Sequence, residues 1–290
     1  MRILITGGQG QLGLALGAAL ANDSVVAPGH TDLDVTNPTG VREAMRTFGP
    51  EVVIHAAAWT DTAGCERDPA RAMAVNAEGA RCVAEAATEA GARTIYIGSN
   101  EVFNGAKGAV YTEDDVPHPI NEYGRSKHEG ERAVQSIDSR SIIVRTSWLY
   151  GPGRVSFPEK IVEAAARGSL RLVTDEIASP TWTVDLAQAI ARLIRTPEAT
   201  GVFHLTNTGA CSRKEWAEMV LSLAGISNVT ITPAKMAEFG LPYSKPAQSA
   251  LANIRAAALG IELRGWQDAM ADHFRTAAQA TLSGTASGTP

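Results

Sequence analysis

The sequence predicts an α/β fold in which a doubly wound parallel sheet carries a second, smaller and discontinuous α/β domain. The first observation is an alternation of apolar strand-like runs with alanine-rich helical stretches up to about Tyr150. The second is an N-terminal strand that leads directly into a glycine-rich turn and then into the helical stretch Leu14–Ala21. The third is the loosening of this alternation after Gly151, where prolines and glycines interrupt the pattern.

Short apolar runs predict the later strands, and alanine-rich stretches predict the helices between them. The runs are Ser24–Ala27, Val52–Ile54, Thr94–Ile97 and Ile142–Val144, and the clearest helix covers Ala70–Ala87. Parallel strands in such a sheet end at a common edge, where ligands bind. Residues that directly follow these runs are therefore candidates for a binding site.

The same patterns predict the domain limits. Val184–Ile194 has the pattern of a helix that returns to the sheet, which makes the second domain discontinuous. A final stretch rich in Ser, Thr and Gly predicts a disordered tail. The predicted limits are 1–150 plus about 175–198 for the sheet domain, about 151–174 plus 199–281 for the second domain, and 282–290 for the tail.

The glycine-rich turn has the spacing of a nucleotide-binding site on a Rossmann-type sheet. Gly7 permits a tight turn, Gly10 lets backbone N–H groups approach a pyrophosphate, and Gly13 allows close packing of helix on strand. We therefore expect a dinucleotide cofactor at this turn. The expected contacts come from Gly7, Gln9, Gly10, Gln11 and Leu12.

Tyr123 and Lys127 lie four residues apart in a helical stretch, so both side chains can face one cleft. A cation beside a phenol favours phenolate and lowers its pKa of ~10 by roughly 1–3 units, which makes the tyrosine a usable acid or base. Ser99 follows a predicted strand, where its hydroxyl can reach a substrate carbonyl oxygen, although such a serine also serves as a turn former or helix cap. These three residues are the predicted catalytic group, and the tyrosine and lysine are also predicted to contact the cofactor.

With these residues in place, the chain resembles the dTDP-4-dehydrorhamnose reductase family of extended short-chain dehydrogenase/reductases over nearly its whole length. The glycine spacing G-x-x-G-x-x-G is the form seen in that superfamily. The similar segments are His55–Ala58, Asn76, Val102–Gly105, Pro119–Lys127, Arg145–Gly151, Ile177–Ala187 and Lys245–Leu251. The last two lie outside a generic dinucleotide fold and therefore point to this family.

The resemblance implies an enzyme that reduces the C4 ketone of a nucleotide-linked 4-keto-6-deoxyhexose with NAD(P)H. Ser99 would hydrogen-bond the carbonyl oxygen, and Tyr123 would deliver a proton to the developing alkoxide. Lys127 would lower the pKa of that tyrosine and hold the nicotinamide ribose. The expected product is a secondary alcohol.

The second predicted strand bears on the choice of cofactor. An acidic residue about 20 residues past the glycines would indicate NAD, and a basic one NADP. The stretch Pro28–Thr31 has neither, and no carboxylate at Gly29 or His30 repels a 2′-phosphate, so we predict NADPH, with NADH also accepted. The resemblance implies further cofactor contacts from Asp34, Val35, Ala56, Ala57 and Ala58. Asp34 could equally be a helix cap before Pro38.

The predicted substrate contacts include departures from the family pattern. Where the family usually reads Ser-Thr-Asp-Tyr-Val-Phe, this chain reads Gly98–Phe103, so Ser99 replaces a threonine and Glu101 introduces a carboxylate. A family lysine is also missing near Ala63 and Gly64. Both changes disfavour an anionic group on the sugar, unless Glu101 is solvated or paired with an arginine. The predicted substrate contacts are Asn100, Glu101, Val102, Trp148 and Lys245.

Two of these contacts have a structural alternative. Trp148 follows a strand end, where its ring can stack on a sugar or nucleobase or can pack in the core. Lys245 can pair with the diphosphate of a nucleotide sugar or remain an exposed lysine before a proline. Arg145 is expected to be structural.

Composition excludes several other classes of protein. The chain has 290 residues, of which 44% are hydrophobic and 20% charged, enough for a large core. A net charge of −5 without Lys/Arg runs argues against nucleic-acid binding, and no stretch reaches 18 apolar residues. We expect a cytoplasmic protein with free thiols at Cys65, Cys82 and Cys211. We predict no metal site, and the resemblance allows a homodimer.

Two rival functions share these motifs. A nucleotide-sugar epimerase or dehydratase has the same glycine turn and Tyr-x-x-x-Lys pair, but usually retains its NAD and turns over without added reductant. A non-catalytic NADP-binding regulatory subunit would bind NADPH without accelerating its oxidation. The intact group Ser99, Tyr123 and Lys127 argues against that second alternative.

Overall fold

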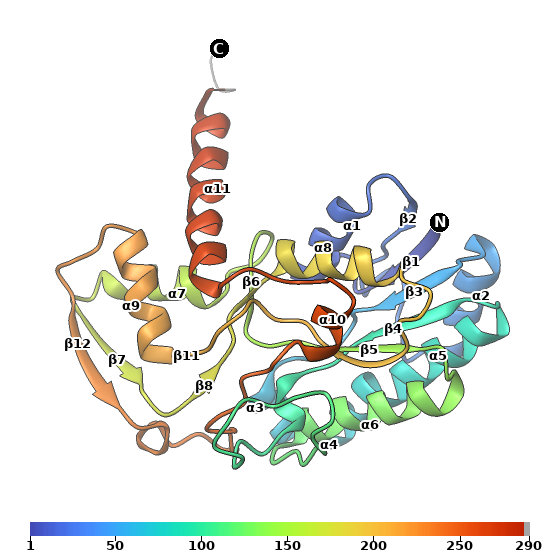
Figure 1. Ribbon diagram of the computed structural model, residues 1–290, viewed down its shortest axis with the longest axis horizontal. Helices are drawn as coiled ribbons and strands as arrows, with labels where there is room; N and C mark the ends of the chain where they lie inside the picture. The colour runs from blue at the N-terminus through green and yellow to red at the C-terminus, as the bar shows by residue number, and fades with distance from the viewer. Residues whose placement is uncertain (287–290) are drawn as a thin grey trace.

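The computed structural model describes residues 1–286, with side chains as far as Ala277. Its centre is a six-stranded sheet with the strand order β10-β5-β4-β3-β1-β2, in which every pair is parallel (Figure 1). The predicted doubly wound sheet is therefore confirmed. The strands are β1 (Arg2–Thr6), β2 (Ser24–Val26), β3 (Val52–His55), β4 (Arg93–Ile97), β5 (Ile142–Arg145) and β10 (Gly201–His204).

Helices cover both faces of this sheet (Figure 1). On one face α1 (Gln11–Ala19) packs against α8 (Thr183–Leu193), the helix expected to return from the second domain. The other face carries α2 (Pro38–Phe48), α5 (Gly79–Glu89) and α6 (Glu122–Ile137). The order of strands reverses between β1 and β3, and a ligand crevice opens at such a switch point.

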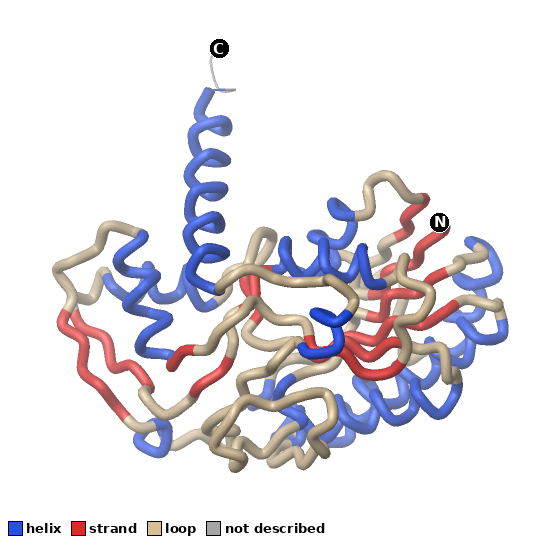
Figure 2. The backbone as a smooth tube through the Cα atoms, viewed as in Figure 1, coloured by secondary structure: helices blue, strands red, loops and turns tan. Residues whose placement is uncertain are grey.

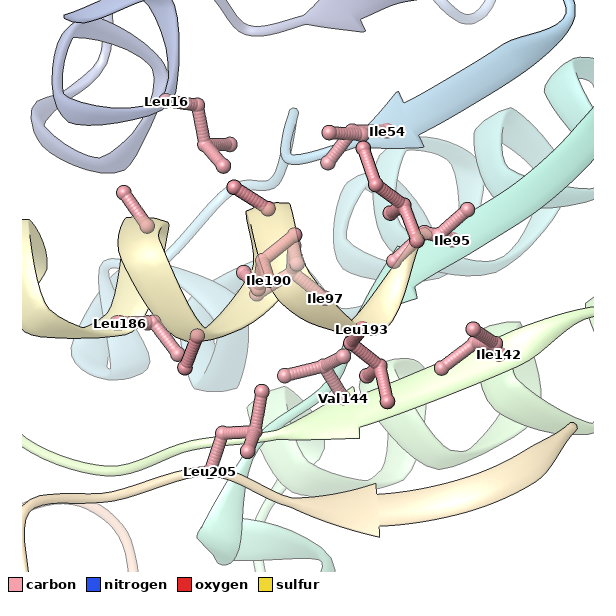
Figure 3. Packing of buried hydrophobic residues seen from close by; sticks show 14 of the residues in the cluster. Leu16, Ile54, Ile95, Ile97, Ile142, Val144, Leu186, Ile190, Leu193 and Leu205 are labelled. Carbon is pink, nitrogen blue, oxygen red and sulfur yellow. The ribbon is translucent and has the colours of Figure 1, made fainter. Parts of the chain in front are cut away.

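The largest apolar cluster lies between the sheet and the helix pair α1 and α8. Figure 3 shows Leu16 of α1 and Leu186, Ile190 and Leu193 of α8 beside isoleucines of the strands. Ile54 and Ile95 are fully buried within it. Burial of such side chains contributes ~1.5–3 kcal/mol each, so α8 is an integral part of the sheet domain.

Local sequence sets where the helices begin. The Asn121 side chain accepts a hydrogen bond from the Gly124 N–H at 2.8 Å, which fixes the start of α6 and places Tyr123 in its first turn. The helix predicted over 70–87 is continuous but changes its winding, from an α-helical start through a π-helical turn back to α. Its parts, with the short helix before it, are α3 (Thr62–Arg67), α4 (Pro69–Met73), η1 (Ala74–Glu78) and α5.

The second domain is a smaller α/β unit with its own apolar cluster, in which Tyr150, Trp216 and Trp266 are buried. Capping boxes at Ser156 and Ser212 start two of its helices. The elements are β6 (Leu149–Tyr150), α7 (Phe157–Ala165), β7 (Ser169–Val173), β8 (Ile177–Ala178), β9 (Thr181–Trp182), β11 (Cys211–Ser212), α9 (Arg213–Leu223), β12 (Thr230–Ala234), η3 (Met236–Phe239) and α11 (Trp266–Ala286). The short helix α10 (Ile254–Ala258) packs instead against β10 of the central sheet. A single 3₁₀ turn, η2 (Asn100–Val102), lies in the loop after β4.

Two predicted limits differ from the structure. Strand β10 pairs with β5 as the edge of the central sheet, whereas residues from 199 onward were expected in the second domain. Helix α11 continues to Ala286 and projects from the body (Figure 2), so the first part of the predicted tail is helical, and residues 287–290 lie outside the described residues. Among the helices described, none is long and apolar enough to cross a membrane.

Candidate active site

A cavity of about 470 Å³ opens at the carboxyl edge of the sheet and extends to the second domain. It joins the loops that follow β1, β3, β4 and β5 to the segment after β6 and to α9. This is the edge at which the sequence placed the site. Its lining is Gly7, Gly10, Gln11, Leu12, Gly13, Ala56, Ala58, Thr60, Thr62, Ile97, Gly98, Ser99, Asn100, Glu101, Tyr123, Lys127, Thr146, Ser147, Trp148, Leu149, Arg154, Val155, Ser156, Phe157, Lys160, Arg213 and Lys245.

The glycine-rich turn forms one end of the cavity. Gly7 has a φ of +69°, and a Cβ there would lie 2.8 Å from the Cα of Ala57. A Cβ on Gly13 would lie 2.4 Å from the carbonyl oxygen of Gly7, so neither position has room for a side chain. Helix α1 begins beyond Gly10 without a side-chain cap, which leaves its first N–H groups for a phosphate. This cradle fits the pyrophosphate of a dinucleotide.

Most of the predicted cofactor contacts line the cavity, and four do not. Gln9 packs against Gly29, and Val35 is buried in the core beside Val41. The Asp34 carboxylate accepts hydrogen bonds from Thr36 in a local turn, and the cap of α2, the alternative for Asp34, is Asn37. Ala57 packs behind the turn. Those within the lining are Gly7, Gly10, Gln11, Leu12, Ala56, Ala58, Tyr123 and Lys127.

Ser99 and Tyr123 meet in the middle of the cavity. Ser99 lies just beyond β4, and its Oγ accepts a hydrogen bond from the N–H of Glu101 at 3.1 Å, so the hydroxyl caps a turn and is still free to donate. Burial raises the pKa of Tyr123 well above its ordinary value, and a hydrogen bond with Ser99 acts in the opposite direction. The phenol is therefore protonated at neutral pH, as a proton donor must be.

Lys127 lies one helical turn beyond Tyr123 and is only 2% exposed. Its Nζ sits 4.2 Å from the ring centroid of Tyr96, a cation–π contact, and burial lowers its pKa to about 7. The sequence predicted that this lysine lowers the tyrosine pKa. In the structure burial dominates both groups, and the pKa of Tyr123 is raised.

Asn76 is bonded to the helix that carries Tyr123 and Lys127. Its Nδ2 donates to Ser126 Oγ of α6 at 3.0 Å and to the carbonyl of Trp59 at 3.0 Å, and its Oδ1 accepts from the Trp59 N–H at 2.8 Å. The amide thus ties the loop after β3 to α6. Asn76 is fully buried in the π-helical turn η1, consistent with an organising role for this part of the site.

The opposite end of the cavity is built from aromatic rings and Arg213. Trp148 has a φ of +43°, the only positive φ among the non-glycine residues described, and its ring stacks on Trp216 with centroids 5.3 Å apart. The Arg213 guanidinium carbon lies 3.6 Å from the centroid of Trp148. Phe157 also stacks on Trp216, at 4.3 Å. Trp148 therefore packs on the core, as one of its two alternatives expected, and also lines the cavity, where stacking on a sugar or nucleobase stays a prediction.

Lys245 lies between two carboxylates. Its Nζ is 3.0 Å from Glu176 and 3.8 Å from Glu101, and Glu176 also pairs with Arg213 at 3.1 Å. The expected diphosphate partner is thus replaced in the structure by two acidic side chains. Glu101 is paired with a lysine. The alternatives expected for this carboxylate were solvent or an arginine.

Two other substrate predictions have different outcomes. Asn100 lines the cavity and donates to Ser249 Oγ at 2.7 Å. Val102 is fully buried in a small apolar cluster with Phe103 and does not line the cavity. The departure at Gly64 has a steric basis, because a Cβ there would lie 2.6 Å from both Trp59 and Asp61.

Sequence reasoning missed several cationic and aromatic residues of the second domain. Arg154, Lys160 and Arg213 line the cavity, and the first two have no ion pair among the residues described. Arg213 follows the cap Ser212 and resembles any charged residue in the first turn of a helix. The only available signal was that cations occur after Gly151, in the segment predicted to begin the second domain.

Comparison with known proteins fits this geometry. The family described as the RmlD substrate binding domain matches residues 1–279. The chain belongs to the RmlD family. A relative described as dTDP-4-dehydrorhamnose reductase from Streptomyces griseus is 36% identical over 282 residues, covering 94% of this chain and 93% of the relative. The Bacillus subtilis protein described as spore coat polysaccharide biosynthesis protein SpsK is 34% identical over 277 residues, with 94% and 97% covered.

A solved member of the family has the same fold throughout. The dTDP-4-dehydrorhamnose reductase of Bacillus anthracis, crystallised in complex with NADP, superposes with a TM-score of 0.91 and 34% sequence identity. The match covers 95% of this chain and 99% of that one. The resemblance inferred from the motifs is therefore confirmed over nearly the whole chain.

Proposed function

We propose that this protein is an NAD(P)H-dependent oxidoreductase that reduces the C4 ketone of a dTDP-linked 4-keto-6-deoxyhexose. One observation carries the proposal: Ser99, Tyr123 and Lys127 line the same cavity as the glycine-rich cradle, and that cavity continues to a cationic and aromatic end. The arrangement holds a redox cofactor and a nucleotide sugar side by side. Relatives at 34–36% identity are described as reductases of this sugar class.

The proposed mechanism assigns one task to each catalytic side chain. Ser99 donates a hydrogen bond to the C4 carbonyl oxygen and polarises it. Tyr123, protonated at neutral pH, transfers its proton to that oxygen as negative charge develops there. NADPH, when held by the glycine-rich turn, would supply the hydride for C4. Lys127, held against Tyr96, lies behind the tyrosine and in its charged form stabilises the phenolate that remains.

The residues present fit the dinucleotide. The turn at Gly7, Gly10 and Gly13 would hold the pyrophosphate, because a Cβ does not fit at Gly7 or Gly13 and the first N–H groups of α1 have no side-chain cap. Position 29 is a glycine, and no carboxylate at 29 or 30 repels a 2′-phosphate. We therefore assign NADPH as the preferred cofactor, with NADH accepted; the Bacillus anthracis relative was crystallised with NADP.

The nucleotide part of the substrate would lie at the second domain. Arg154 and Lys160 line this part of the cavity and form no ion pair with any residue that the structure describes, so they are the candidates for the diphosphate. Trp148 and Phe157 offer ring faces for a nucleobase. Lys245 is engaged by Glu176 and Glu101 and is assigned instead to the sugar end.

The test follows NADPH absorbance with purified protein and dTDP-4-keto-6-deoxy sugars generated in situ. We expect sugar-dependent oxidation, slower with NADH, and none when either component is omitted. Copurified NAD and turnover without reductant would favour an epimerase or dehydratase. NADPH binding without oxidation by any ketosugar would favour a regulatory subunit. Action in the cytoplasm is part of the proposal.

A further inference from the structure

Glu101 is a carboxylate placed beside the reacting centre without a catalytic task. It belongs to the turn η2, directly after Ser99, and its backbone N–H donates to the catalytic hydroxyl. Its side chain lines the cavity and is 12% exposed. Its carboxylate accepts a hydrogen bond from Asn121, the residue that caps α6 two positions before Tyr123, so it lies beside the helix turn that carries the phenol. The residue therefore faces the part of the cavity that receives the ketone.

The two oxygens of this carboxylate have different surroundings. Oε2 accepts a hydrogen bond from Asn121 Nδ2 at 2.7 Å, which fixes the plane of the group. Oε1 lies 3.8 Å from Lys245 Nζ, beyond hydrogen-bond distance, and accepts no hydrogen bond from the described residues. A carboxylate has about four lone-pair sites, so acceptor capacity remains on the oxygen that has no protein donor.

The charges around Glu101 explain how a carboxylate can stand near an anionic substrate. Lys245 bonds primarily to Glu176 at 3.0 Å, and Glu176 pairs in turn with Arg213. Two carboxylates and two cations thus form a chain with no net charge. Lys245 is attracted to Glu101 but does not satisfy it, and the diphosphate meets no net negative field.

We propose that Glu101 Oε1 accepts a hydrogen bond from the C3 hydroxyl of the ketosugar and thereby selects substrates that carry a donor next to the ketone. This inference rests on the proposed reduction at C4. The neighbours of C4 in a 4-keto-6-deoxyhexose are C3, with its hydroxyl, and C5, with a methyl group, so the C3 hydroxyl is the polar substituent adjacent to the ketone. When the sugar lacks this hydroxyl, the Glu101 carboxylate is left without a hydrogen-bond donor in a partly buried site. Such a loss lowers kcat/KM for that sugar strongly.

The test compares two dTDP-4-keto-6-deoxy sugars that differ only in the presence of the C3 hydroxyl. We expect the parent to prefer the hydroxylated sugar and Glu101→Ala to lower that preference roughly 10- to 100-fold, by losing kcat/KM on the hydroxylated sugar. Glu101→Gln keeps a neutral acceptor and should lie between the two. Glu129→Gln, which removes an exposed carboxylate paired with Arg132 on α6, should leave the preference unchanged.

Several outcomes would overturn the inference. Equal loss on both sugars in Glu101→Gln and Glu101→Ala, with NADPH affinity intact, would reduce Glu101 to a support for the catalytic loop. A parent that prefers a 3-amino sugar over the hydroxylated one would show that the carboxylate reads a cation instead. If the parent reduces no ketosugar, the proposed function fails separately. The ratio of calorimetric Kd values for the two sugars, compared between parent and Glu101→Ala, then decides the role of Glu101.

Discussion

The two ends of the cavity are built in different ways. The redox end is made of short contiguous motifs, the glycine-rich turn and the pair Tyr123 and Lys127 on α6, seated on the edge of one sheet. The sugar-nucleotide end is assembled from segments far apart in the chain, and ion pairs join Glu101, Glu176, Arg213 and Lys245 across it. The first end is held by burial and close backbone packing, whereas the second is held by ion pairs between side chains.

We expect the residues of the redox end to set the rate of the chemical step and the residues of the other end to set which sugar nucleotide binds. Substitutions at the redox end should affect the chemical step or cofactor affinity with every sugar, because that end touches what all substrates share. Substitutions at the other end should affect KM and the choice of sugar, and leave NADPH binding unchanged. Four experiments can break or sharpen this division.

The largest effect is expected from Tyr123→Phe. Loss of the hydroxyl removes the proton donor, so kcat should fall roughly 10²–10⁴-fold while the Kd for NADPH stays within a factor of two or so. Steady-state kinetics and fluorescence titration measure the two quantities. The control Tyr111→Phe removes a buried hydroxyl bonded to Asn104 outside the cavity and should not change kcat. Wild-type turnover in Tyr123→Phe would falsify the mechanism.

Arg213→Ala is expected to have the next largest effect, and at the other end. It removes the cation over Trp148 and leaves Glu176 with Lys245 alone, so KM for the nucleotide sugar should rise roughly 10- to 100-fold. The matched control is Arg171→Ala, because Arg171 also pairs with a glutamate and lies over an aromatic ring, outside the cavity. A matching rise in the Kd for NADPH would mean that the two ends are not separable.

The glycine-rich turn offers a comparison within one helix. Gly13→Ala places a Cβ 2.4 Å from the Gly7 carbonyl oxygen, so we expect ~1–3 kcal/mol of destabilisation and roughly tenfold weaker NADPH binding. A Cβ on Gly17 of the same helix meets nothing within 4 Å, and Gly17→Ala should stabilise the protein by ~0.4–1 kcal/mol. Thermal unfolding and cofactor titration test both. Equal behaviour of the two variants would contradict the packing argument.

The last effect concerns the buried lysine and pH, and it is the smallest per step because it is spread over several pH units. Burial lowers the pKa of Lys127 to about 7 from an ordinary value of 10.5, so between these values the unfolded chain binds the additional proton. Stability should therefore rise with pH across this window, by about 1 kcal/mol per unit from this group. In urea unfolding at several pH values, the free energy of unfolding of Lys127→Met should rise less steeply with pH than that of the parent. Parallel curves for parent and variant would mean that Lys127 keeps its ordinary pKa in the folded protein.

The same contrast explains what the sequence could predict. The parallel sheet, the glycine turn and the group Ser99, Tyr123 and Lys127 follow from local spacing, because each motif needs only its own strand end or helix turn to be placed. The direction of the Tyr123 pKa could not be foreseen, since it depends on burial by the whole fold.

The distant contacts were out of reach for the same reason. The salt bridges of Lys245 join residues from three separate segments, and neither spacing nor composition reveals such pairs. Val102 and Asp34 were placed in the site by similarity of segment. Their side chains instead serve the core and a local turn, a distinction that requires the direction of each side chain.

The late arrival of α8 and β10 along the chain has a consequence for synthesis on the ribosome. A nascent chain that ends near residue 150 already contains five strands of the sheet and helix α1, but lacks the helix that covers Leu16 and the adjacent isoleucines. That apolar face stays open to chaperones or to neighbouring nascent chains until Leu193 has left the exit tunnel. The sheet domain therefore begins at the N-terminus, but its core is complete only after α8 and β10 have been synthesised. We expect a gene fragment that ends at residue 150 to yield a protein that aggregates.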